Sequence, residues 1–187
     1  MIRKIKSVDE PVFRTILTTI DIDRRAGHFV SKRILNWLNN IELYIKLYLI
    51  IKNEQASETR QKSIVRVYDR MGTDTGYAVF NDWTAFTVYR LNGDVTSVTE
   101  IAMMGIFPEF RGNGFAKDML SEMIDSQSSD LLLARCLPAS TQCLKLFLDV
   151  GFVQICQYER NSTLVAKGSD EDIESLLLAV DQYRKKF

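Results

Sequence analysis

A turn formed by Arg111, Gly112, Asn113 and Gly114 carries the residues best suited to chemistry in this sequence. The two glycines allow the backbone to approach a ligand closely or to take a positive φ without a side-chain clash. Apolar residues recur at helical spacing from Ala116 onward, so a helix that begins here points its unpaired N–H groups into the turn. Arg111 adds a planar, charged fork suited to phosphate. The pattern predicts an anion site that accepts a pyrophosphate.

The same residues also fit an ordinary strand-to-helix connection in which Arg111 is solvated, because two glycines in a turn are common. Two other phosphate-binding motifs do not fit. The turn lacks the Gly-Lys-Ser/Thr ending of a P-loop, and the third glycine of a dinucleotide-binding fingerprint is missing.

Three neighbouring segments must position the turn. The apolar run 98–106 is predicted to be a strand that leads into it. A short, continuous apolar run over 131–137, stopped by Pro138, is typical of a buried central strand. Residues 140–150 have the spacing of a helix that Gly151 closes.

The N-terminal part is predicted to be mostly helical. Residues 2–7 alternate like a short strand, and a helix with Ser7 or Asp9 as its cap and Pro11 in its first turn follows. After a break at 24–28, a second amphipathic helix carries Phe29, Ile34, Trp37 and Leu38 and stops at Asn39-Asn40.

Residues 41–51 have Ile or Leu at every odd position, which matches the period of a strand. The same run also satisfies a wide helical stripe; we predict a strand. A polar loop over 53–62 follows. Further β segments are predicted at 63–69, 75–80, 83–90, 152–159 and 162–167, with a turn at 71–74 and a final helix capped by Ser169.

Composition excludes several classes of protein. The 187 residues suffice for one domain, and the 24 basic and 24 acidic residues leave no net charge that would favour nucleic acid or an anionic membrane. The three cysteines have neither metal-site spacing nor an even number, which favours a reducing, cytoplasmic setting. A single histidine, His28, leaves almost no material for histidine-based triads or histidine-rich metal sites. No segment predicts a secretory signal or a membrane span.

Arg111-x-x-Gly114-x-Ala116, after a strand that ends Gly-Ile-Phe-Pro-Glu, resembles the acyl-CoA-binding motif Arg/Gln-x-x-Gly-x-Gly/Ala of the GNAT N-acyltransferase superfamily. The predicted order β-α-α-β-β-β-α-β-α-β-β is also the GNAT order, with one extra β run and an added C-terminal helix. The resemblance covers roughly residues 1–167 and is specific from 98 to 152.

The resemblance implies an α/β fold with three α-β-α layers and a splayed, mixed central sheet. It implies a single domain over 1–187, divided into an acceptor side at 1–97, an acyl-CoA-binding core at 98–167 and the extra helix at 168–187.

Direct transfer of an acetyl or other acyl group from acetyl-CoA to an amine is the implied activity, with no metal. Backbone groups of Met104 and Ile106 would hydrogen-bond the pantetheine arm, and one of those amides would hold the thioester oxygen. The pyrophosphate would be held by Arg111 and by the N–H groups of the turn and first helical residues: Gly112, Asn113, Gly114, Phe115 and Ala116.

The second family motif, Asn-x-x-Ala-x-x-Leu-Tyr-x-x-x-Gly-Phe, is matched in spacing from Ser140 to Phe152. Ser140 stands at the asparagine position and Phe147 at the tyrosine that is the common general acid, while Cys143 lies between them at the alanine position. These residues would still border CoA. Because phenylalanine has no proton to give, three alternatives follow: Ser140, Cys143 or Tyr158 substitutes for it, water serves as the acid, or the protein binds CoA without efficient turnover.

Glu100 is the candidate general base. The segment around it resembles the strand of the histone-acetyltransferase branch in which a glutamate deprotonates the acceptor, and desolvation strengthens a carboxylate as a base. The alternative is an exposed glutamate at the start of a strand.

Two other functions remain open. Phe147 motivates a CoA-binding regulatory or interaction module with little catalysis. Modification of a nucleobase or an aminoglycoside is a third option, although neither a basic stripe nor an acidic cleft signature is present. The acceptor is a small molecule or a protein, and the extra helix could serve a homodimer. Arg135 could meet an acidic acceptor, but a structural or solvated role is favoured for it, as a capping or surface role is for His28.

Overall fold

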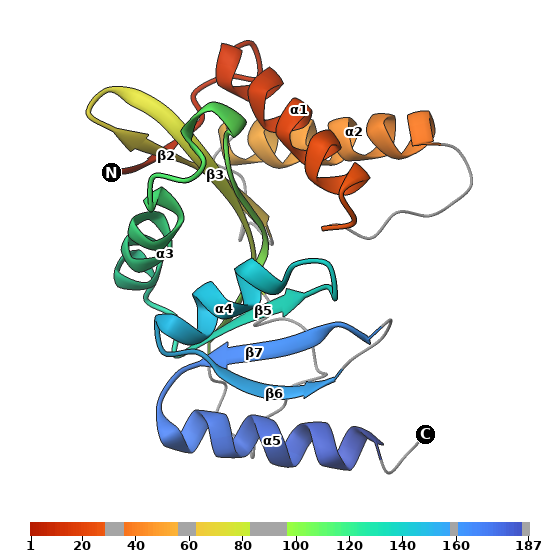
Figure 1. The fold of residues 1–187 in the computed structure, drawn as a ribbon, viewed down its shortest axis with the longest axis vertical. Coiled ribbons are helices and arrows are strands. Elements are labelled where there is room, and N and C mark those ends of the chain that lie inside the picture. The colour runs from red at the N-terminus through yellow and green to blue at the C-terminus, as the bar shows by residue number, and fades with distance from the viewer. Residues whose placement is uncertain (29–35, 56–62, 83–96, 158–160, 185–187) are drawn as a thin grey trace.

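Figure 1 shows the computed structural model of the chain, which describes residues 1–28, 36–55, 63–82, 97–157 and 161–184. Apart from the strand predicted at 41–51, the described elements follow the predicted order. The strands are β1 (Ile2–Lys4), β2 (Ser63–Arg70), β3 (Thr73–Asp82), β4 (Val98–Ile106), β5 (Leu131–Cys136), β6 (Val153–Gln157) and β7 (Thr163–Lys167). The helices are α1 (Pro11–Arg25), α2 (Asn36–Gln55), α3 (Phe115–Ser126), α4 (Thr141–Asp149) and α5 (Asp170–Arg184), with a short 3₁₀ turn at Pro108–Phe110.

The strands form one seven-stranded mixed sheet in the order β1-β2-β3-β4-β5-β7-β6. β4 and β5 are parallel, and the other neighbouring strands described are antiparallel. The β4–β5 pairing therefore joins the half of the molecule that carries α1 and α2 to the half that carries α5 (Figure 1).

Helices cover both faces of the sheet. Successive β3 residues alternate between two clusters: Tyr77 and Val79 pack with α1 and α2, whereas Ala78 and Phe80 pack with α3 and α4. On β5, Leu131 and Leu133 pack against Leu176 of α5, whereas Leu132 and Ala134 face the α3–α4 side. This alternation is the two-residue period of a strand. The predicted three-layer α-β-α arrangement is confirmed.

The predicted strand over 41–51 is wrong, because these residues lie within α2. Leu47, Ile50 and Ile51 are buried against the sheet, at helical spacing. Ile41, Ile45 and Leu49 lie on another face and are about half exposed. The alternating apolar residues thus belong to two faces of one helix. The helix also runs through the predicted stop at Asn39-Asn40 and into the predicted 53–62 loop, ending at Gln55.

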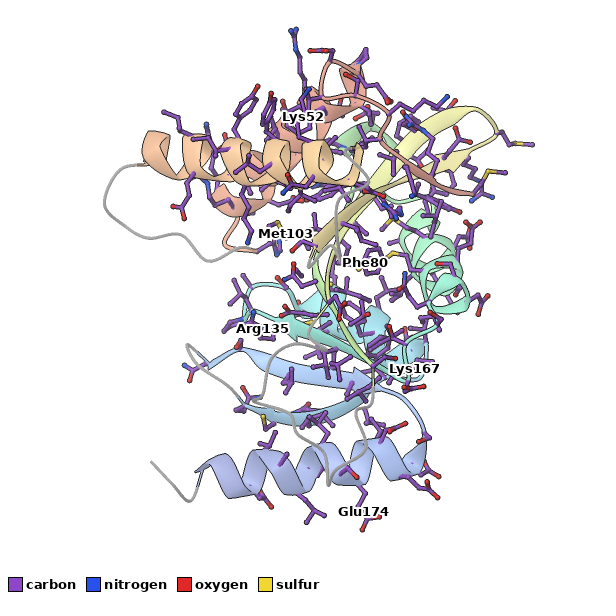
Figure 2. The ribbon with its side chains drawn as sticks, turned by 180° about the vertical axis from the view of Figure 1, so that it is seen from behind. Lys52, Phe80, Met103, Arg135, Lys167 and Glu174 are labelled. Carbon is purple, nitrogen blue, oxygen red and sulfur yellow. The ribbon has the colours of Figure 1, made fainter. Side chains whose placement is uncertain are left out.

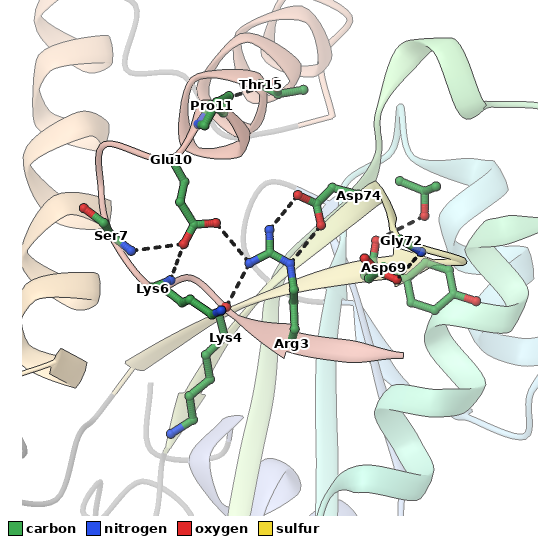
Figure 3. A network of polar contacts seen from close by, with 12 residues as sticks. Arg3, Lys4, Lys6, Ser7, Glu10, Pro11, Thr15, Asp69, Gly72 and Asp74 are labelled. Atoms are coloured by element: carbon green, nitrogen blue, oxygen red, sulfur yellow. Dashed lines mark hydrogen bonds and ion pairs between the residues drawn. The ribbon is translucent and has the colours of Figure 1, made fainter.

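The start of the chain differs from prediction as well. β1 ends at Lys4, and Glu10, instead of Ser7 or Asp9, occupies the N-cap of α1 without capping it through its side chain. Its carboxylate instead accepts hydrogen bonds from the N–H groups of Lys6 and Ser7. Arg3 bridges Glu10 (3.0 Å) and Asp74 of β3 (2.6 Å), as Figure 3 shows. This network ties the β1–α1 connection to the sheet.

Other local predictions are confirmed. The turn predicted at 71–74 forms but is shorter: Met71 and Gly72 make it, with φ of 54° and 82°, and β3 begins at Thr73. The strand into the motif, the helix after Gly114, the strand near 131–137 and the helix closed by Gly151 all form. Ser169 caps α5 by accepting a hydrogen bond from the N–H of Asp172 (3.2 Å). The predicted β run at 83–90 and the start of the second helix, including Phe29 and Ile34, lie outside the described residues.

Candidate functional site

The site begins with a split between β4 and β5. Their pairing extends from Val98↔Leu131 to Ile101↔Ala134 and then ends. On the other side of β4, Phe80 pairs with Ile101 and Val79 with Met103, so Ala102 is the extra residue of a β-bulge. A bulge bends its strand and increases its twist. The edge of β4 over 102–106 therefore turns away from β5, which gives the predicted splayed sheet.

A cleft of about 340 Å³ occupies this split. One wall is the open edge of β4 and the turn that follows it, and the other is the end of β5 with the first turns of α4. Asp23 and His28, from the end of α1, complete the lining.

The glycine turn has the predicted geometry. Gly112 and Gly114 have φ of 82° and 78°, the left-handed region that favours glycine. A Cβ built on either residue would meet no atom within 4 Å, so the backbone conformation and not crowding requires glycine. Lys117 donates its N–H to the carbonyl of Gly114 (3.0 Å). The N–H groups of Phe115 and Ala116, which precede Lys117 in the first turn of α3, have no intrahelical partner. The turn can therefore bind an anion.

Arg111 is held by protein groups. Its Nε donates to the carbonyl of Ile106 (2.9 Å), and its Nη2 donates to both carboxylate oxygens of Asp23 (2.8 and 3.0 Å). Within the described residues Nη1 has no partner, so one edge of the guanidinium remains for a ligand. The pair with Asp23 fixes the turn to the end of α1.

A buried tyrosine lies beneath this pair. Tyr77 is fully buried and, in the described part of the chain, its hydroxyl has no hydrogen-bond partner. Burial raises the pKa of this hydroxyl well above its ordinary value, and the charge of Asp23 adds to the rise. The ring passes under Gly105, where a Cβ would lie 2.8 Å from its Cε1 atom. Gly105 is therefore needed for the approach of the ring to β4.

Ser140 occupies the N-cap of α4 and is buried, yet its side chain makes no capping hydrogen bond. Instead, its Oγ lies 3.1 Å from Nδ1 of His28. Phe147, two helical turns further on, is buried and packs edge-to-face on Phe152 with the ring centroids 4.8 Å apart. Phe147 is thus part of the core.

Two thiols lie together on this wall of the cleft. Cys136 and Cys143 share a hydrogen bond, which raises the pKa of the Cys136 thiol and lowers that of Cys143. Burial raises the Cys136 pKa further and opposes the lowering at Cys143. Cys143 is the thiol that ionises more readily.

Glu100 is 4% exposed and does not line the cleft. Its Oε1 accepts from Nε of Arg135 (2.8 Å) and its Oε2 accepts from Nδ2 of Asn81 (3.1 Å). Arg135, labelled in Figure 2, is 48% exposed and lines the cleft. Its ion pair with Glu100 links that carboxylate to the cleft. The Glu100 carboxylate is thus engaged by Arg135 and Asn81 and lies outside the cleft. The base role of Glu100 therefore stays a prediction.

Most residues predicted for CoA binding line the cleft. They are Met104, Ile106, Arg111, Gly112, Gly114, Phe115, Ala116, Ser140, Cys143 and Phe147. Asn113 does not; its side-chain amide donates to the carbonyls of Phe110 (3.1 Å) and Arg111 (3.2 Å) and so stabilises the turn. Tyr158 lies outside the described residues.

The sequence did not place Asp23 and His28 in this site. Asp23 is 88 positions from Arg111 and His28 is 112 from Ser140, so no local spacing connects them. The one signal in the sequence was that His28 is the single histidine of the chain.

Two further properties bear on the type of site. Across the described ranges, no group of three or more histidine, cysteine, aspartate or glutamate residues could hold a metal ion. None of the described helices is long and apolar enough to cross a membrane.

Comparison with solved structures identifies the fold. An acetyltransferase of the GNAT family from Streptococcus agalactiae matches with a TM-score of 0.63 at 14% identity, over 91% of this chain and 95% of that protein. The PaiA N-acetyltransferase of Thermoplasma acidophilum, in complex with coenzyme A, matches with a TM-score of 0.63 at 13% identity, over 90% and 98%. YncA of Salmonella typhimurium, with its cofactor acetyl-CoA, matches with a TM-score of 0.54 at 20% identity, over 91% and 94%.

No model of a protein family matches the sequence, and the comparison with curated proteins gives no match. At these identities the structural likeness shows the fold alone. The chain has the GNAT fold.

Proposed function

We propose that this protein is an N-acyltransferase that moves an acyl group, most simply acetyl, from acyl-CoA directly to an amine. One observation carries the proposal. Residues 102–106 of β4 do not pair with β5, and they lead into a glycine turn in which a Cβ on Gly112 or Gly114 would meet no atom within 4 Å. A ligand with an extended, amide-bearing arm and a pyrophosphate matches both parts, and acyl-CoA has both.

The cleft offers a place for each part of the donor. Backbone groups of Met104 and Ile106 would pair with the pantetheine amides as a further strand would, since the β4–β5 pairing ends before them. The N–H groups of 112–116 and Nη1 of Arg111 would hold the pyrophosphate. Two of the fold neighbours were solved with acetyl-CoA or CoA, which supports this placement.

Transfer also needs a polarised thioester carbonyl, an amine without its proton and an acid that protonates the departing thiolate. A backbone amide of the open β4 edge would stabilise the thioester oxygen. Glu100 would take the amine proton through water or with displacement of Arg135. Residues 1–97 would form the acceptor side, and the acceptor would be a small molecule or a protein. We propose a cytoplasmic setting, because three cysteines are an odd number without metal-site spacing, a pattern that favours a reducing compartment.

A specific observation favours a second function, a CoA-binding regulatory or interaction module. Phe147, at the position of the usual acid, is buried in the core and has no proton to donate. If nothing else donates one, transfer would be slow while CoA binding would persist.

The test is calorimetric titration with acetyl-CoA, CoA and pantetheine, followed by a thiol-release assay over amines, peptides, nucleosides and aminoglycosides. Pantetheine lacks the pyrophosphate and should bind much more weakly than CoA. Binding of CoA with release of thiol for one acceptor class would establish the transferase. Binding without release across the panel would favour the regulatory module, and equal affinity for pantetheine would contradict the assignment of the turn.

A further inference from the structure

We infer that Ser140 and His28 form a proton relay that protonates the departing thiol, in place of the acid missing at Phe147. The inference rests on the proposed acyl transfer and specifies which residues complete it. Nδ1 of His28 lies 3.1 Å from Oγ of Ser140, although the two residues are far apart in the chain. Together they would supply the general acid of the site.

The position of Ser140 is the first argument. A serine at an N-cap normally accepts a hydrogen bond from the second or third helical N–H. Here the side chain makes no such bond and its hydroxyl meets the imidazole instead. Both residues line the cleft. A buried hydroxyl that is not used for capping can pass on a proton.

His28 is the second argument. Its backbone N–H donates to the carbonyl of Asp23 (2.9 Å), and Asp23 is bound through its carboxylate to Arg111 in the glycine turn. The imidazole is therefore positioned by the same contacts that fix the proposed pyrophosphate site. An imidazole can carry a proton near neutral pH and give it up, which a serine hydroxyl alone does not do.

The transfer of protons balances. The attacking amine loses its proton to the base or to water. When the carbon–sulfur bond breaks, its electron pair goes to sulfur, which takes the proton of Ser140 Oγ. Oγ in turn takes the proton on Nδ1 of His28, leaving a neutral imidazole. Solvent returns a proton to His28 before the next turnover. The products are an amide and the free thiol of CoA.

Other titratable groups share the cleft with the relay. Asp23 and Arg111 form a pair with offsetting charges, and Arg135 is paired with Glu100, which does not line the cleft. Cys143 is the competing proton donor, because the hydrogen bond that it shares with Cys136 lowers the pKa of its thiol. A Cys143→Ala variant separates this alternative from the relay.

The test compares His28→Gln, Ser140→Ala and the double variant, using acetyl-CoA and the amine that gives the fastest thiol release in the panel. Because a general acid contributes on the order of 100-fold or more, and an aliphatic thiolate leaves more readily than most groups, we expect kcat to fall about 10- to 100-fold. The double variant should be no slower than either single variant, because the two residues act as one unit.

Two further variants serve as comparisons. Ser162→Ala removes a buried serine outside the cleft and should keep the wild-type kcat. Cys143→Ala should slow thiol release less than either relay variant. A loss of kcat in Cys143→Ala as large as that in Ser140→Ala would assign the proton to the thiol and overturn the relay.

The pH profile separates a relay from a structural role. The wild-type kcat should fall on the alkaline side as the imidazole loses its proton, and this limb should be absent from both single variants. CoA affinity should change by less than about threefold, as expected for a group that acts mainly in the transition state. Since His28 is the single histidine, its ring NMR signals need no assignment and should shift when Ser140 is replaced by alanine.

Wild-type kcat and an unchanged alkaline limb in His28→Gln would overturn the relay while leaving the transferase intact. Additive losses in the double variant would also overturn it. Absence of thiol release from the wild-type protein, despite CoA binding, would refute the transferase itself, so the two failures are distinguishable.

Discussion

Replacing the turn glycines by alanine tests the phosphate site against an internal control. Gly112 and Gly114 have φ of 82° and 78°, and a Cβ on either would meet nothing within 4 Å. Gly72, in the β2–β3 turn, has the same backbone conformation (φ 82°) and the same open surroundings, and it does not line the cleft. Alanine therefore costs about the same backbone free energy at each of the three positions. Only Gly112 and Gly114 face the proposed pyrophosphate.

The structure sets the expected magnitudes. A left-handed conformation costs a residue with a Cβ roughly 1–2 kcal/mol, so each variant should lose about that much stability. For a chain of 187 residues this corresponds to a fall in Tm of about 2–8 °C. Alanine keeps its N–H, but its Cβ would occupy space that the proposed pyrophosphate needs to approach the backbone. A hydrogen bond to a charged group contributes about 1.5–3 kcal/mol, so displacing one N–H contact to phosphate should weaken CoA binding about 10- to 100-fold.

Calorimetric CoA titration and thermal unfolding of the variants measure the two effects separately. Gly112→Ala and Gly114→Ala should lose both stability and CoA affinity, and Gly72→Ala should lose only stability. Wild-type affinity in both cleft variants would refute the phosphate assignment. A matching loss of affinity in Gly72→Ala would show that reduced stability, not a lost contact, weakens binding.

Three further changes test other parts of the structure. Burial opposes ionisation of Glu10, but hydrogen bonds from backbone N–H groups and Arg3 outweigh it and lower its pKa. Its stabilisation is therefore full above the ordinary glutamate pKa of about 4.3 and is lost as the pH falls through the lower folded value. Glu10→Gln should cost about 1–2 kcal/mol at pH 7 by urea unfolding, and the difference from wild type should shrink below about pH 4; a constant difference would contradict this. Iodoacetamide should label Cys143 before Cys136, and CoA should slow that labelling, as measured by peptide mass spectrometry; labelling of Cys136 first would contradict the pKa order. Glu100→Gln should lower thiol release mainly at pH below the acceptor's pKa, where a base must remove the amine proton, and should leave CoA affinity nearly unchanged; an unaltered rate would make Glu100 a structural residue.

The glycine turn was predictable because its signal is local. A positive φ at Gly114, the apolar helical spacing after it and the strand before it are all contained in one short segment. The cap of α5 by Ser169 and the Met71-Gly72 turn were predictable for the same reason. In each case neighbouring residues limit the backbone to a few conformations.

Residues 41–51 show where local reasoning is insufficient. Their pattern fits both a strand and a helix, and the choice depends on what surface is present to cover. The structure buries Leu47, Ile50 and Ile51 against the sheet and leaves Ile45 and Leu49 half exposed. All five residues are apolar, so their spacing alone does not show which face of the helix is buried.

The amino-acid sequence by itself determined most of the order of the elements, the motif turn and the lack of a titratable side chain at Phe147, because these depend on residue type and short-range geometry. Tertiary structure decided the rest of the site. It paired Arg111 with Asp23, Glu100 with Arg135 and His28 with Ser140. These contacts join elements far apart in the chain, so they form only when the helices and strands have packed together.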